Sequence, residues 1–170
     1  MKLNSKRTIL VGLAFLSICA FWQMYDSIVP LILTKTFHMN ETFSGAIMAA
    51  DNILALFLLP FFGSVSDKSH TKIGKRMPFI LFGTGCAIIL MNILPLLDNS
   101  YAAQPSGFKT ASFVIVLGLL LVAMGTYRAP AVALMPDVTP KPLRSRANAI
   151  INLMGAVGGI SYLIVAAVLY

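Results

Sequence analysis

Three ionisable residues lie inside long apolar segments of this sequence, where a charge is hard to accommodate. Asp26, Asp51 and Arg128 are each flanked on both sides by uncharged runs. A charged side chain at the centre of a membrane-spanning helix costs about 2.5–3.5 kcal/mol on insertion scales, so such residues normally face a cavity or one another. Two acids and one base therefore predict a partly paired network that can bind a proton or a polar solute.

Each of these residues also has a purely structural interpretation. Arg128 could extend along its helix to the lipid headgroups, and Asp51 could hydrogen-bond to a neighbouring helix. Asp26 lies nearer the outer surface, which strengthens the structural alternative there. The sequence alone leaves these alternatives open.

Aromatic residues accompany Asp26 at helical spacing. Trp22, Tyr25, Asp26 and Val29 follow the i, i+3, i+4, i+7 pattern of one helix face. Rings beside a carboxylate suit a sugar, because the rings can stack on it and the carboxylate can accept hydrogen bonds from its hydroxyls. The alternative is an aromatic belt at the membrane interface, which fits Tyr25 better than Trp22.

A stripe of small and polar residues follows near the carboxyl end of the sequence. Asn148, Asn152, Gly155 and Gly159 are spaced to share one helix face. Such a stripe is typical of closely packed membrane helices. A position for Asn152 in a cavity is the alternative.

The composition identifies the elements that must position these residues. Of the 170 residues, 58% are hydrophobic and 11% are charged, the mean hydropathy is +0.83, and an average soluble domain has about 25% charged residues. This composition excludes a soluble monomer. In lipid the backbone N–H and C=O groups have no water to bond, so they must bond to one another within helices, and a helix that crosses the membrane needs about 20 residues. The sequence predicts an all-α membrane protein with five transmembrane helices, at residues 9–33, 43–63, 77–97, 112–135 and 148–170.

The basic residues lie almost entirely on one side of these spans. Of the 13 Lys and Arg residues, ten precede the first span or lie in the connections 64–76 and 136–147, whereas only Lys35 and Lys109 lie on the other side. The positive-inside rule therefore predicts a multi-pass protein of the cell membrane with a cytoplasmic amino terminus. The net charge of +7 does not indicate nucleic-acid binding, which needs a continuous basic face, because the basic residues cluster in short segments between apolar runs; the apolar composition predicts the lipid bilayer as the partner.

No catalytic constellation is evident in the sequence. His38 and His70 are isolated in loops on opposite sides, and Cys19 and Cys86 lie inside apolar runs. Membrane zinc proteases need ligand spacings such as His-Glu-x-x-His. We therefore expect no enzyme activity, no metal site and no cofactor; a non-transporting membrane scaffold or an intramembrane enzyme is the alternative to a transporter.

The connection after the second span carries a recognisable motif. Pro60 is followed by Gly63-Ser-Val-Ser-Asp67-Lys68, and then by Gly74-Lys75-Arg76 and Pro78. This resembles the signature loop of the major facilitator superfamily, in the form found in glycoside cation symporters and plant sucrose transporters. Residues 127–139 and 146–158 are similar to the same group, so the resemblance covers most of the chain.

The resemblance implies a fold and a mechanism. It places residues 1–170 as a partial amino-terminal six-helix bundle of a twelve-helix transporter, which would need the remaining helices as partners. The expected activity is symport of a sugar or glycoside by alternating access, with a proton as the coupling ion. Asp51 would titrate, and Arg128 would pair with it or bind the sugar.

The same resemblance implies roles for the residues of the cytoplasmic loops. Gly63 would permit close helix approach, and Asp67 would meet Arg144 or Arg146 in one conformational state. The residues expected to form this conformational motif are Gly63, Asp67, Lys68, Gly74, Lys75, Arg76, Arg144 and Arg146.

The sequence departs from the family pattern at positions that bind ions and sugar. The two acids that serve cation binding in melibiose permeases fall on Ala55 and Leu59, so a proton is favoured over sodium. Their sugar-binding acid falls on Arg128, whereas the functional arginine of sucrose transporters falls one turn later, at Val132. The chain also stops at Tyr170 with no polar tail, which predicts a truncated protein.

The orientation of the chain can be tested by labelling single cysteines. We expect a membrane-impermeant thiol reagent to label position 104 in intact cells and to leave position 70 unlabelled, because the basic loops stay in the cytoplasm. The reverse pattern would show that the predicted orientation is wrong.

Overall fold

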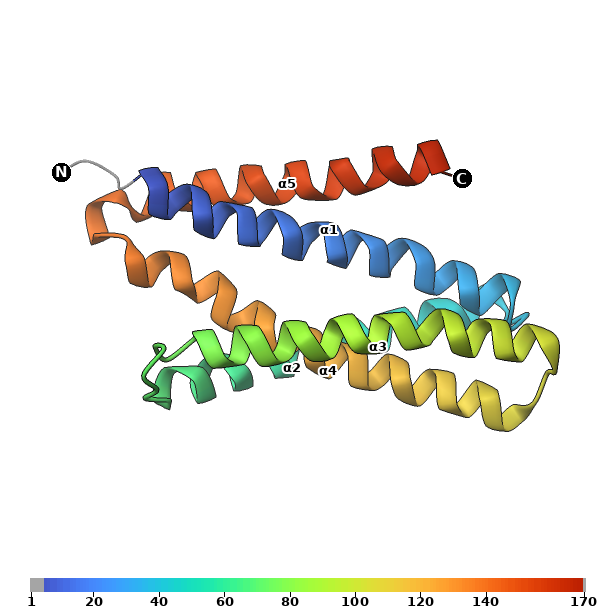
Figure 1. Cartoon of the computed structure of the whole chain (residues 1–170). Coiled ribbons are helices and arrows are strands. Elements are labelled where there is room, and N and C mark those ends of the chain that lie inside the picture. The colour runs from blue at the N-terminus through green and yellow to red at the C-terminus, as the bar shows by residue number, and fades with distance from the viewer. Residues whose placement is uncertain (1–4, 170) are drawn as a thin grey trace. The chain divides into compact units, whose positions relative to one another are not determined.

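The structure is a computed structural model that describes the backbone of residues 5–169 and the side chains of residues 8–169. Its elements are α1 (Ser5–Lys35), α2 (Glu41–Lys68), α3 (Met77–Ala103), α4 (Gly107–Val138), the 3-10 helix η1 (Lys141–Leu143) and α5 (Arg144–Leu169) (Figure 1). Five helices are long and apolar enough to cross a membrane. The predicted all-α membrane fold with five spans is confirmed.

The helices are longer than the predicted spans, mostly at the expense of the connections. The predicted outer loop 98–111 is largely helical, because α3 continues to Ala103 and α4 begins at Gly107. Lys109 stabilises this tight connection, since its Nζ donates to the carbonyl oxygens of Ser100 at 2.7 Å and Gln104 at 2.9 Å. A lysine that contacts the last carbonyls of a helix also complements the helix dipole.

The chain divides into two compact units. One consists of Met1–Ser27 and Ala131–Tyr170, and the other of Ile28–Pro130. The division falls inside α1 and α4, close to Pro30 and directly after Pro130. Proline lacks a backbone N–H and removes one helical hydrogen bond, so these are positions at which each helix is most easily bent. The single bundle expected over residues 1–170 stays a prediction.

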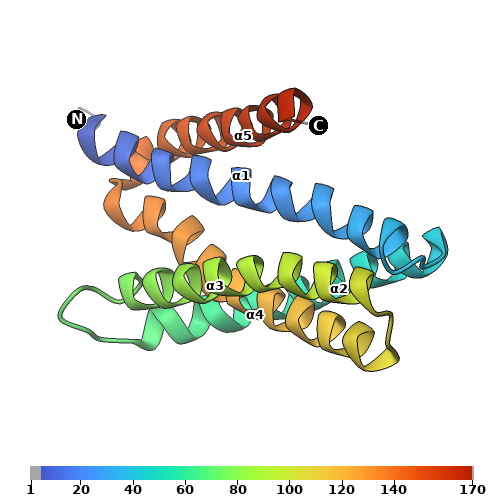
Figure 2. The ribbon, with the colours of Figure 1, turned by 45° about the vertical axis from the view of Figure 1, so that its right-hand side comes forward.

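In the first unit, the amino-terminal part of α1 runs beside α5 (Figures 1 and 2). Glycines make this close approach possible. A Cβ atom at Gly155 would lie 2.9 Å from Cys19 Sγ, and one at Gly158 would collide with the backbone carbonyl of Leu16. Because lipid gives no hydrophobic drive for two helices to associate, close contact through small residues is the main source of their attraction.

The packing face of α5 differs from the predicted stripe. Its buried residues are Ala147, Ile151, Gly155 and Gly158, so only Gly155 is shared with the predicted set. Ala147 and Ile151 form an apolar cluster with Met135, against which Val11 and Phe15 pack. The prediction was wrong by one residue at the other three positions, because it selected small and polar types and ignored the apolar residues beside them.

The second unit contains the end of α1, α2, α3 and most of α4. A cluster of three aromatic rings joins its elements, with ring centroids 4.2 Å apart for Phe37 and Tyr101 and 4.6 Å for Phe37 and Phe113. Two glycines again mark close helix contacts. A Cβ at Gly83 would lie 2.9 Å from Tyr127, and one at Gly125 would lie 3.2 Å from Leu58 Cβ.

Large apolar side chains cover the outside of the helices. Leu56, Phe57 and Phe82 are 67–70% exposed, for example. Such extensive apolar exposure is unfavourable in water and appropriate in hydrocarbon. It supports lipid as the surrounding medium of these helices.

The tightest helix contact generates a stability prediction. We expect Gly158→Ala to destabilise the first unit by about 1–3 kcal/mol, the usual range for overpacking, because the new methyl group meets the Leu16 backbone and not a flexible side chain. Thermal unfolding in detergent measures the effect.

Gly45→Ala in α2 is the matched control, since no described atom lies within 4 Å of its added Cβ. That change should leave stability equal or slightly higher, because alanine favours helix. Equal melting temperatures for Gly158→Ala and the wild-type chain would contradict the proposed close contact.

Candidate functional site

An ion pair closes the connection between α2 and α3. Arg76 Nη2 donates to Asp67 Oδ1 at 2.8 Å, and Lys75 Nζ lies 3.8 Å from the same oxygen. The Arg76 side chain is 7% exposed, whereas that of Asp67 is 54% exposed. A buried guanidinium needs a charged or polar partner, so Asp67 permits Arg76 to be buried at the start of α3.

Ser66 completes this cluster from the last turn of α2. Arg76 Nη1 donates to Ser66 Oγ at 3.4 Å, and the Ser66 hydroxyl donates to the carbonyl oxygen of Gly63 at 2.9 Å. Ser66 is fully buried, and it was not singled out from the sequence. The available signal was its place directly before the aspartate of the motif.

A tight turn in the connection returns the chain toward Asp67. The N–H of Gly74 donates to the carbonyl oxygen of Thr71 at 3.0 Å, and the Thr71 hydroxyl donates to the carbonyl oxygen of Gly74. Gly74 has a φ of 104°, a conformation that other residues rarely adopt. The glycine of the motif is therefore required by the backbone of the turn.

Gly63 does not have the role expected of it within the described residues. No described atom lies within 4 Å of a Cβ added there, so it makes no close helix contact in this part of the structure. Residues 64–68, predicted as the beginning of a loop, instead form the last turn of α2. The glycine, serine and aspartate residues of this segment favour a turn, but the helical hydrogen bonds of α2 continue through it.

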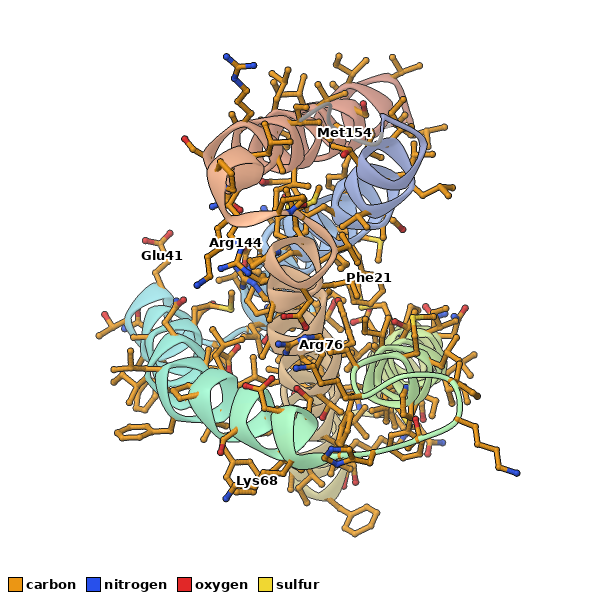
Figure 3. All side chains as sticks on the ribbon, turned by 90° about the vertical axis from the view of Figure 1, so that its left-hand side faces the viewer. Phe21, Glu41, Lys68, Arg76, Arg144 and Met154 are labelled. Atoms are coloured by element: carbon orange, nitrogen blue, oxygen red, sulfur yellow. The ribbon has the colours of Figure 1, made fainter. Side chains whose placement is uncertain are left out.

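The other basic residues of the motif have different environments. Lys68 is exposed at the end of α2, where its side chain extends away from the helix, whereas Arg76 points inward (Figure 3). Arg144 and Arg146 are exposed in the first unit, and Arg144 Nε donates to the carbonyl oxygen of Thr139 at 3.3 Å. Pairing of Asp67 with Arg144 or Arg146 in another conformation stays a prediction.

Asp51 and Arg128 lie in the middle of two packed helices of the second unit. Asp51 is ten residues after the start of α2 and Arg128 ten residues before the end of α4, about 15 Å from those ends at about 1.5 Å per residue. Both are half-buried. The α2–α4 contact at Leu58 and Gly125 lies between their levels. Both residues lie away from the ends of their helices, and their position at membrane depth stays a prediction.

An additional half-buried carboxyl group within a helix was missed. Asp98 was assigned to a loop because the third span was predicted to end at 97, but α3 continues past it. Its Oδ1 is buried and has no hydrogen-bond partner among residues 8–169. The available signal was that uncharged, helix-compatible residues continue after Asp98.

The aromatic face proposed for sugar stacking is not open. Tyr25 and Val29 are buried, with exposed fractions of 1% and 0%, whereas Asp26 is exposed. Trp22 is half-buried, with its ring centroid 6.2 Å from that of Tyr25. The four positions therefore do not form one accessible face, because some of them lie on the packed side of the helix and others on its exposed side.

Asn152 lies on the exposed side of α5, outside the packing face. This is compatible with the cavity alternative and does not establish it. Among the described residues, no group of three or more His, Cys, Asp or Glu side chains is placed to hold a metal ion. The assignments of proton and sugar ligands stay predictions.

Comparison with known proteins relates the chain to membrane transporters. The family model described as Major Facilitator Superfamily matches residues 11–170. The chain is 35% identical over 151 residues to the sucrose transport protein SUC3 of Arabidopsis thaliana, covering 82% of this chain and 25% of that protein. It is 34% identical over 153 residues to the sucrose transport protein SUT3 of Oryza sativa subsp. indica, covering 82% and 30%.

A bacterial relative is also similar over a shorter region. The putative transporter YdfJ of Escherichia coli is 34% identical over 92 residues, covering 51% of this chain and 20% of that protein. No solved structure matches the chain. The chain thus spans about a fifth to a third of the length of these relatives.

The Asp67–Arg76 pair predicts an effect on the order of the loop. We expect Asp67→Asn to increase amide hydrogen exchange over residues 69–76 by several-fold, because the neutral amide attracts the buried guanidinium less strongly and hydrogen bonds to charged groups contribute about 1.5–3 kcal/mol. Hydrogen exchange with mass spectrometry measures this.

The matched control is Glu41→Gln, which removes one negative charge at the other end of the same helix. It should leave exchange in residues 69–76 unchanged. If both variants, or neither, loosen that loop, the ion pair does not order it.

Proposed function

Because the chain belongs to the major facilitator superfamily, we propose that it forms part of a transporter that moves a sugar or glycoside together with protons. The relatives named as sucrose transport proteins support the sugar. The chain itself is an integral, multi-pass membrane protein. The remaining helices of the transporter, the cell membrane and a cytoplasmic amino terminus belong to the same proposal.

The observation that carries the proposal is the position of Asp51 and Arg128. Each is held at mid-helix, and their two helices pack together through Gly125 and Leu58. Asp51 lies seven residues before Leu58 and Arg128 three residues after Gly125, about 10 Å and about 5 Å along the axes from the contact. An acid and a base so placed can change their separation when the helices shift.

Such a change in separation is a means of coupling protons to transport. A carboxylic acid binds its proton more tightly in a dry, apolar environment and less tightly beside a guanidinium group. We infer that Asp51 is protonated in the outward-open state and releases its proton when Arg128 or the sugar approaches in the inward-open state. Alternating access supplies the helix movement.

The structure favours this role for Asp51 over Asp26. Asp51 is half-buried within the second unit, as Arg128 is, whereas Asp26 is exposed. Partial burial supplies the desolvation that tunes a carboxyl group. We propose that Asp26 and Asn152 lie on the surface that faces the rest of the transporter. Trp22 would contact the sugar there only through the exposed part of its ring.

The alternative functions receive less support. The matched relatives are named as transport proteins and not as enzymes. A membrane scaffold would need neither an acid nor a base at mid-helix, and both are costly there. A full-length protein with no transport activity would favour the scaffold.

The proposed coupling predicts the behaviour of two variants of the full-length transporter. Asp51→Asn should abolish proton-driven accumulation of sugar and preserve sugar exchange, because asparagine resembles a permanently protonated acid. Arg128→Ala should impair both, because it removes the base whose approach is proposed to release the proton from Asp51 and to contact the sugar. Sugar-induced alkalinisation and counterflow measure the two activities.

Asn52→Ala is a neighbouring control, since the Asn52 amide already donates to the Met48 carbonyl oxygen of its own helix at 3.0 Å. This variant should transport as the wild type does. Wild-type accumulation and proton stoichiometry in Asp51→Asn would show that Asp51 is structural and that protons bind elsewhere.

A further inference from the structure

The connection between α2 and α3 presents an apolar side chain at the tip of a rigid turn. Thr71 and Gly74 close the turn by hydrogen bonds between their own atoms, which leaves Lys72 and Ile73 at its two central positions. The Ile73 side chain is 67% exposed. This isoleucine lies outside the apolar helices in a loop held by hydrogen bonds, so its side chain is accessible to an apolar environment.

Lys68 and Lys72 precede this isoleucine in the sequence, and the acid of the same segment is engaged by other basic residues. Asp67 is the acid of the segment 67–76 and is already bound by Arg76 and Lys75. Lys68 and Lys72 are exposed, and neither forms an ion pair within the described part of the chain. Figure 3 shows the Lys68 side chain directed away from the helices. The segment therefore displays positive charge beside an apolar tip.

The position of the segment relates these features to the membrane. It connects Lys68, the last residue of α2, with Met77, the first residue of α3, and both helices are candidate membrane spans. Eight residues between two spans keep the turn near the level of the lipid headgroups. Lysines that reach phosphate groups and an apolar side chain that enters the acyl boundary are the components of an interfacial anchor.

We propose that the turn 71–74 is a membrane-surface anchor that binds anionic phospholipid, with Ile73 inserted at the acyl boundary and Lys68 and Lys72 contacting the phosphates. A protein partner fits less well, because one isoleucine among lysines is far smaller than the apolar centre of a stable protein interface. The Asp67–Arg76 pair holds the base of the turn and keeps the acid away from these lysines. The proposal does not depend on the transported solute or on the coupling ion.

A fluorescent probe at position 73 tests the anchor in the 170-residue chain. Trp22 is the single tryptophan, so the variant Ile73→Trp in a Trp22→Phe background reports on one site. In vesicles of phosphatidylcholine and phosphatidylglycerol, we expect blue-shifted emission and strong quenching by lipids brominated along their acyl chains. Helical circular dichroism equal to that of the wild-type chain confirms that the probe has not disturbed the fold.

The lysines are tested in the same background. Lys68→Gln with Lys72→Gln should reduce bromolipid quenching at least two-fold, as should replacing the vesicles by phosphatidylcholine alone or adding high salt, which screens exposed charges. The matched control Lys35→Gln removes an exposed lysine at the opposite end of the spans and should leave quenching unchanged.

Two results would overturn the proposal. Red-shifted emission that bromolipid does not quench would place position 73 in water. Blue-shifted emission without bromolipid quenching, equal in both kinds of vesicle, would show that protein covers the turn, either a second copy or another polypeptide.

A second measurement uses the chain without the tryptophan probe. Native mass spectrometry measures how much phosphatidylglycerol the chain retains, and this retention should fall at least two-fold in the Lys68→Gln, Lys72→Gln variant. Equal retention also contradicts lipid binding.

Discussion

Hydrocarbon offers no hydrogen bonds, and the architecture of this protein follows from that constraint. The backbone satisfies it by forming helices of membrane length. Several exposed polar side chains satisfy it locally by donating to the carbonyl oxygen four residues earlier in their own helix. Examples are Ser27 with Gln23, Asn52 with Met48, Asn92 with Ile88, Ser112 with Phe108 and Ser161 with Val157. These residues can face lipid without a partner on another helix.

Ionisable groups cannot be satisfied so simply, and this separates candidate functional residues from the rest. A carboxylate can accept hydrogen bonds but has none to accept from a helical backbone, whose N–H groups are already used. Asp51 and Arg128 are accordingly half-buried at mid-helix, and Arg76 is buried beside Asp67 and Ser66. Asp51 and Arg128 are the residues of the proposed coupling, whereas the Asp67–Arg76 ion pair closes one short connection.

Close helix packing has the same origin in each of the two compact units. The attraction between helices in lipid comes from contact and not from the release of water, so backbones approach where side chains are absent. Gly158 against Leu16 in one unit and Gly83 against Tyr127 in the other are such places. The units are continuous through α1 and α4 near Pro30 and Pro130, where helical hydrogen bonding is weakest.

The sequence by itself determined the features that depend on local composition. Five apolar runs predicted five spans, because a span needs only enough consecutive apolar residues. The motif from Gly63 to Arg76 predicted the family, and the turn within it needs glycine at position 74. Tertiary structure decided which face of each helix is packed. A period of 3.6 residues does not distinguish the buried side of a helix from the side next to it. The predicted packing stripe through Asn152 was therefore displaced by one residue. Tyr25 and Asp26 were predicted to share one accessible face, but Tyr25 is buried and Asp26 is exposed. Helix ends were decided similarly, since α3 continues past Asp98 to Ala103 and Lys109 donates to the carbonyl oxygens of Ser100 and Gln104 at that end.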